Sequence, residues 1–208
     1  MGIPRWVLVV ASLVVFVLVL LGLGFLGNRL FFEKQFDSTT WTAFGTWLLV
    51  IGTLVAVQWQ VWQQRQINSA NNVIILHDRF ESKILQNCRK KLSQLLLRKG
   101  DLQQEDDDVL VFFETMGLLT RKGILEKEMV WNEFCWEIVR YYLALTEPKN
   151  QIATLRANAS DHTLYENFEW LYKELLEIDA KRRKVTPEIA KARPKDVQEF
   201  LIGESTLP

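Results

Sequence analysis

An arginine and a histidine six positions apart are the residues of this chain whose types and spacing could do chemistry. Arg156 and His162 bound the segment RANASDH, and Asn158 lies between them. A guanidinium can neutralise phosphate charge through paired hydrogen bonds. An imidazole can accept and return a proton near neutral pH. The sequence therefore makes Arg156, Asn158 and His162 the candidate catalytic residues.

This spacing resembles the Arg-x4–6-His motif of the HEPN superfamily, helical bundles that often cleave RNA as dimers. The resemblance implies that Arg156 would steady phosphate charge and that His162 would move the proton of a ribose 2′-hydroxyl. The residue after the arginine is often polar in that superfamily, whereas here it is Ala157, so the chain departs from the pattern. The alternative is structural, with Arg156 paired to a nearby acidic side chain and His162 in the solvated first turn of a helix.

Other catalytic and metal-binding patterns do not occur in the sequence. One further histidine, His77, and two cysteines, Cys88 and Cys135, are too few and too scattered for a zinc site. There is no glycine-rich phosphate loop and no serine elbow. We therefore expect no metal and no cofactor, and a non-catalytic role is the leading interpretation.

The charge balance excludes a general attraction to nucleic acid or anionic lipid. Lysine plus arginine and aspartate plus glutamate number 25 each, so the formal net charge is zero. Two local basic clusters could contact lipid headgroups or RNA phosphates. The second also suits a helix end, where basic side chains interact favourably with the dipole. The first cluster is Arg89, Lys90 and Lys91, and the second is Lys181, Arg182, Arg183 and Lys184.

Two uncharged apolar runs at the start of the chain predict a transmembrane hairpin over residues 1–64. They cover residues 6–28 and 38–64, and each reaches the ~20 residues that a helix needs to cross the hydrocarbon core. Tryptophans flank both runs, as at membrane interfaces. The arginines favour the inner membrane, with both termini and the remaining domain in the cytosol. Small residues spaced for close helix contact in lipid predict an oligomer interface at Gly45, Gly52 and Ala56.

The sequence predicts a cytosolic antiparallel helical bundle over residues 65–184, so the expected fold class is all-α. Apolar residues recur at three- and four-residue steps from Val73 to Leu95, and similar patterns predict further helices downstream. Nothing alternates with a period of two, so no sheet is expected. Residues 185–208 are expected to form a loosely docked tail with a short helix.

The run FFETMG at residues 112–117, followed by later glycine and aromatic positions, resembles a bacterial domain family of unknown function. The resemblance covers about residues 68–178, and members often follow one or two membrane spans. It implies a helical, membrane-tethered domain and carries no activity. We expect Glu114 to face Arg121 or Arg156. The family-motif residues are Phe113, Glu114, Gly117 and Gly123.

The leading prediction is a membrane-anchored, homo-oligomeric helical interaction or effector module without catalysis, acting on the membrane in stress or phage defence. The layout is similar to HEPN-like membrane proteins linked to CRISPR systems that assemble into pores. No charged residue lies within either apolar run, so a pore would need an uncharged lining. One alternative is a membrane-tethered HEPN-like ribonuclease using Arg156 and His162, with RNA as its partner. Another is an accessory subunit that recruits a protein partner to the lipid bilayer.

Overall fold

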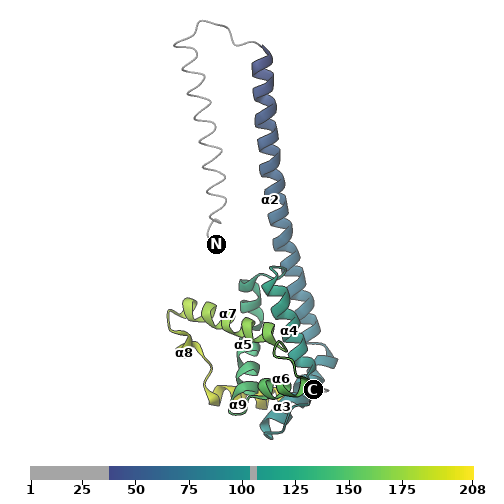
Figure 1. The fold of residues 1–208 in the computed structure, drawn as a ribbon, viewed down its shortest axis with the longest axis vertical. Coiled ribbons are helices and arrows are strands. Elements are labelled where there is room, and N and C mark those ends of the chain that lie inside the picture. Colours follow the sequence, from purple (N-terminus) through teal and green to yellow (C-terminus); the bar gives the residue numbers. More distant parts are fainter. Residues whose placement is uncertain (1–37, 104–106) are drawn as a thin grey trace. The chain divides into compact units, whose positions relative to one another are not determined.

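The structure, a computed structural model, is helical and contains no strand in the residues that it describes, 38–103 and 107–208 (Figure 1). The predicted all-α class is confirmed for these residues. The chain divides into two compact units, Met1–Gln63 and Gln64–Pro208. The helices are α2 (Ser38–Phe80), α3 (Lys83–Leu97), α4 (Asp108–Arg121), α5 (Lys127–Thr146), α6 (Gln151–Ala159), α7 (Glu166–Arg183), α8 (Pro187–Ala190) and α9 (Pro194–Ser205).

Of the two predicted membrane spans, the described residues contain one. By length and composition, the stretch Gly45–Phe80 of α2 qualifies as a candidate span, and its most apolar window has no buried residue. Trp47 and Leu49 in this stretch are 68% and 72% exposed. The other predicted span, residues 6–28, lies outside the described residues. The structure therefore supports one span and not the whole predicted hairpin.

The long helix predicted through Val73 and Leu95 is in fact two helices. α2 ends at Phe80, and α3 begins at Lys83 because Ser82 caps it. The Ser82 hydroxyl accepts a hydrogen bond from the Leu85 N–H at 3.4 Å and donates one to the Arg79 carbonyl at 2.6 Å. The apolar spacing continues on both sides of the break, so periodicity alone does not reveal it.

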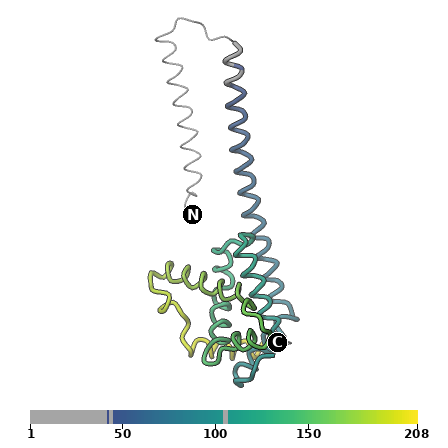
Figure 2. The backbone as a smooth tube through the Cα atoms, viewed as in Figure 1, coloured from purple at the N-terminus to yellow at the C-terminus, as the bar shows by residue number. Residues whose placement is uncertain are grey.

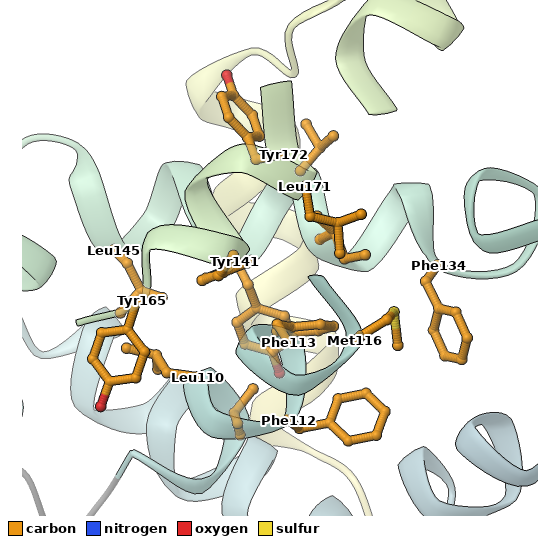
Figure 3. Close-up of a cluster of buried hydrophobic side chains, with 14 of the residues drawn as sticks. Leu110, Phe112, Phe113, Met116, Phe134, Tyr141, Leu145, Tyr165, Leu171 and Tyr172 are labelled. Atoms are coloured by element: carbon orange, nitrogen blue, oxygen red, sulfur yellow. The ribbon is translucent and has the colours of Figure 1, made fainter. Parts of the chain in front are cut away.

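Aromatic side chains from four helices form the centre of the bundle. Phe113 of α4 is fully buried and stacks on Phe168 of α7, with ring centroids 5.2 Å apart. Its ring also contacts Phe80 of α2 and Tyr141 of α5, at 5.9 and 5.7 Å. Figure 3 shows Phe113 beside Tyr141 and Met116 in this cluster. The family-motif phenylalanine is thus a core residue that joins four helices.

The C-terminal residues are not the loose tail that the sequence predicts. Figure 2 shows the chain after α7, drawn in yellow, returning to the bundle, where α9 packs against α3 and α5. Glu204 of α9 accepts two hydrogen bonds from the Arg89 guanidinium, at 2.7 and 2.6 Å, and one from the Tyr141 hydroxyl at 2.5 Å. Arg89 and Glu204 are only 4% and 7% exposed. This ion pair fixes the end of the chain to the core.

Arg89 therefore does not belong to a solvated basic patch, as its sequence neighbours suggest. Its remaining donor bonds the Phe80 carbonyl at 3.1 Å and Glu81 at 3.0 Å, and its guanidinium lies 3.8 Å from the centre of the Phe80 ring. The pKa of Arg89 is raised by its hydrogen bonds and ion pair with Glu204, which outweigh the opposing effect of burial. The arginine stays charged inside the bundle because its donor groups have partners.

Removing the Glu204 carboxylate tests the buried ion pair between Arg89 and Glu204. Glu204→Ala leaves a buried guanidinium without its counter-ion and is expected to lower the free energy of unfolding by about 3–5 kcal/mol. The matched control is Glu199→Ala, also on α9, whose carboxylate is exposed and forms an ion pair with Lys195. Thermal unfolding in detergent, followed by tryptophan fluorescence, compares them. Equal melting temperatures for the two variants would contradict the assignment.

Candidate functional site

The family-motif glycine marks a point where two helices touch through their backbones. A Cβ atom on Gly117 of α4 would lie 2.3 Å from the carbonyl oxygen of Asn167 in the first turn of α7. That distance is far inside van der Waals contact, so the main chains could not stay this close with a larger residue. Gly117 therefore sets how closely α4 and α7 approach.

Glu114, one turn earlier on α4, caps the same end of α7. Its carboxylate accepts hydrogen bonds from the Phe168 N–H at 2.8 Å and from the Asn167 side-chain amide at 2.7 Å. N–H groups in a first helical turn lack partners within the helix, and negative charge is favourable there. The residue preceding the helix, Tyr165, gives no side-chain cap. Glu114 of another helix takes that role.

The predicted partners of Glu114 are therefore wrong. Arg121 bonds Glu166 and the Asn167 side-chain oxygen, and Arg156 bonds Glu169. A half-buried carboxylate suggested an arginine partner for Glu114. The first turn of α7 supplies hydrogen-bond donors instead, so no arginine is needed.

Gly123 caps the C-terminal end of α4. Its φ is +70°, which suits glycine. The Gly123 N–H bonds the Thr120 carbonyl and the Ile124 N–H bonds the Leu119 carbonyl, both at 3.0 Å, which is the Schellman pattern. At the end of α3, by contrast, Lys99 rather than the following Gly100 takes the left-handed conformation, at φ 55°.

Arg156 is held by the contact between α6 and α7. Its Nε donates to the Leu164 carbonyl at 2.8 Å, and its Nη2 donates to Glu169 at 3.0 Å. Its side chain is 22% exposed. Lys173 also bonds Glu169 and is the larger cause of the lowered pKa of that carboxyl, with Arg156 adding to it. These bonds orient the guanidinium towards its own protein and join α6 to the start of α7.

His162 lies in the exposed turn between α6 and α7, rather than in a first helical turn, and Asn158 is exposed on α6. Asp161 accepts two hydrogen bonds from Thr163, which are the main cause of its lowered pKa. The charges of His162 and Arg156 contribute smaller amounts. The structure shows no hydrogen bond or ion pair between Arg156 and His162 among the described residues. The catalytic assignment of these residues stays a prediction.

No group of three or more metal-ligating side chains could hold an ion within the part of the chain that the structure describes. Burial raises the pKa of the Cys135 thiol to about 12, so it is protonated at neutral pH. The Cys88 sulfur lies 3.3 Å from an Asp108 oxygen. A nucleophilic cysteine requires a lowered thiol pKa, whereas the pKa of Cys135 is raised.

The second basic cluster is largely used in ion pairs on the bundle itself. Lys181, Arg182 and Arg183 pair with Glu177, Glu128 and Asp179 respectively. In the first cluster, Lys90 donates to the Leu207 carbonyl at 2.6 Å. These contacts favour helix-end and packing roles over a continuous anion-binding surface.

Sequence reasoning missed an exposed apolar face on α2. Ile67, Ile74 and Ile75 are 60%, 58% and 63% exposed, although large aliphatic side chains prefer burial. Val73 and Leu76 of the same helix face the core, at 8% and 7%. Ile74 and Ile75 lie between these two inward positions, and that departure from the apolar stripe was the clue in the sequence.

Comparison with family models matches residues 47–175 to a domain of unknown function (DUF4760). This is more than half of the chain, and it includes the α4 motif together with Arg156 and His162. Comparison with curated proteins and with solved structures gave no match. The matched region ends within α7, so α9 and Glu204 lie beyond it.

Gly117→Ala tests the close crossing of α4 and α7. The added methyl group meets backbone rather than a movable side chain, so we expect a loss of about 1–3 kcal/mol in the free energy of unfolding. Gly203→Ala is the matched control, because a Cβ there meets nothing within 4 Å in another helix. It is expected to stabilise by about 0.5–1 kcal/mol. Similar shifts in the thermal unfolding of the two variants would refute the crossing argument.

Arg156→Ala and His162→Ala separate a structural role from a catalytic one. Arg156→Ala removes two hydrogen bonds and is expected to lower the free energy of unfolding by about 1–3 kcal/mol. His162→Ala is expected to change it by less than about 0.5 kcal/mol, because that side chain is exposed. Thermal unfolding measures both, with cleavage of a fluorescent RNA assayed alongside. An unchanged Arg156→Ala melting temperature, with RNA cleavage lost in both variants, would instead support catalysis.

Proposed function

The chain belongs to the DUF4760 family, and from that premise we propose that it is a membrane-anchored helical module that acts by binding, first of all to further copies of itself. The anchor in this proposal is a two-span hairpin formed by residues 6–28 together with the apolar part of α2. Both termini and the bundle are cytosolic in this arrangement. Support comes from the one candidate span in α2 and from the charge distribution of the sequence.

The exposed isoleucines of α2 are the observation that carries the proposal. Full burial of one such side chain contributes about 1.5–3 kcal/mol. Ile67, Ile74 and Ile75 together therefore offer enough apolar surface to favour association. All three lie on α2, so the α2 helix of a second copy can pack against them and bury the same side chains of both copies.

Membrane anchoring strengthens such a contact without any new interaction. Copies held in one bilayer share an orientation and a high effective concentration, so a modest interface is sufficient. The small residues Gly45, Gly52 and Ala56 are the part of this proposed interface that lies within the span. Among the described residues, no atom of another part of the chain lies within 4 Å of a Cβ atom added to Gly45 or to Gly52, so none of these residues blocks a neighbouring helix there.

The surroundings of Arg156 support a non-catalytic function over the ribonuclease alternative. A catalytic arginine directs its donors towards the substrate, whereas here two donors of Arg156 bond the Leu164 carbonyl and Glu169. The protonated Cys135 thiol and the ion pairs of Lys181, Arg182 and Arg183 also favour a non-catalytic function. Binding by an exposed apolar face needs none of these groups.

Charge introduced into the isoleucine face should break the self-association. Ile67→Glu with Ile74→Glu places two carboxylates in the proposed contact, and we expect the mass of the detergent-purified protein to fall towards that of a monomer. Light scattering with the detergent contribution subtracted measures it. Ile189→Glu on α8 is the matched control, since Ile189 is 63% exposed but lies elsewhere. A monomeric wild type, or an unchanged mass in the double variant, would refute the proposal.

A further inference from the structure

A cleft of about 760 Å³ lies between the C-terminal ends of α3 and α5 and one side of α9. Its volume falls within the range of about 300–1,000 Å³ that is typical of small-molecule sites. Apolar side chains from all three helices form its walls, so the surface offered to a ligand is mainly hydrocarbon. They are Leu96, Leu97, Leu143, Ala144, Val197 and Leu201.

One polar group beside this wall, the Gln151 amide, is already used within the protein. Gln151 is 4% exposed, and its side-chain amide donates to the Gly100 carbonyl at 2.9 Å and accepts from the Leu102 N–H at 3.3 Å. Its amide oxygen and nitrogen are thus both engaged in joining α6 to the segment after α3. A peptide would need partners for its own backbone groups, whereas an alkyl chain needs none.

The rim of the cleft carries a positive charge that no described residue neutralises. Glu147 pairs with Lys191, and Lys149 pairs with Asp101. Lys99 also lines the cleft, and no ion pair of the described residues includes it. Its side chain is exposed at the end of α3. The site therefore combines an apolar interior with a cation at its edge.

We propose that this cleft binds a long-chain fatty acid, with the alkyl chain between α3, α5 and α9 and the carboxylate paired with Lys99. The complementarity is twofold, because the apolar walls match the alkyl chain and the exposed ammonium matches the anionic head. The proposal does not depend on self-association. Membrane lipid as the source of this ligand rests on the proposed anchoring in the bilayer.

Photocrosslinking of the full-length protein in phosphatidylcholine nanodiscs tests the site. The probe is a sixteen-carbon fatty acid with a diazirine in its chain, and mass spectrometry maps the labelled peptides. We expect labelling to concentrate in peptides that contain Leu97, Leu143 and Val197. The matching fatty alcohol, which lacks the charge, is expected to label them about tenfold less, the factor for one lost charge-assisted hydrogen bond.

Two kinds of variant distinguish the contribution of the ligand's carboxylate from that of its alkyl chain. Lys99→Gln is expected to reduce labelling by the acid to the level of the alcohol. Lys184→Gln is its matched control, because Lys184 is also an exposed lysine at a helix end with a φ of 55° but does not line the cleft. Ala144→Phe fills the cleft from α5 and is expected to abolish labelling by both probes. Val197→Phe fills it from α9 and serves if the first variant does not fold.

Three results would overturn the proposal. The first is equal labelling of the cleft by the acid and the alcohol. The second is labelling that persists in a filled-cleft variant whose circular dichroism and melting temperature match those of the wild type. The third is labelling spread evenly over the bundle. A phosphatidylcholine carrying the same diazirine distinguishes the source, since equal labelling of the cleft by it would mean that a bilayer lipid, and not a free fatty acid, occupies the site.

Discussion

The backbone contact between α4 and α7 at Gly117 is the constraint on which the rest of the bundle depends. It fixes the first turn of α7, where the Glu114 carboxylate satisfies the Phe168 N–H. With that turn fixed, the Phe168 ring stacks on Phe113 at the centre of the core. The same turn follows the Leu164 carbonyl that Arg156 binds. One glycine thus determines the packing of the core and the position of the candidate catalytic arginine.

A second constraint comes from the buried contacts of Glu204 with Arg89 and Tyr141. They attach the C-terminal helix α9 to α3 and α5. Burying an ion pair contributes little stability relative to apolar packing, but a partner left unpaired is strongly unfavourable. Such a pair therefore specifies where α9 docks more than it adds to stability. The position of α9 has a functional consequence, because this helix forms one wall of the apolar cleft. Glu204 therefore helps to position one wall of the cleft.

Features that depend on residues close in the sequence, such as helix caps, can be predicted from it. Side-chain burial and partners that depend on residues far along the chain cannot. Gly123 was predictable because a helix end and a glycine are adjacent in the chain. The burial of Arg89 was not, since it lies in a run of basic residues and its partner Glu204 is 115 positions away. Glu114 failed for the same reason, because its partner is the start of a helix 54 positions on. The break at Ser82 is an intermediate case, in which a local cap interrupts an apolar pattern that continues across it.

The bundle distributes its apolar surface between a closed core and exposed positions on α2. The bundle buries its aromatic centre completely, and Phe113, Phe134 and Phe168 are at most 1% exposed. Ile67, Ile74 and Ile75 on α2 nevertheless remain more than half exposed, and exposed apolar surface of this kind usually marks a contact with another molecule or with lipid. The arginine that could do chemistry is meanwhile bonded within the protein. Both facts support the proposal of a binding role over the ribonuclease alternative.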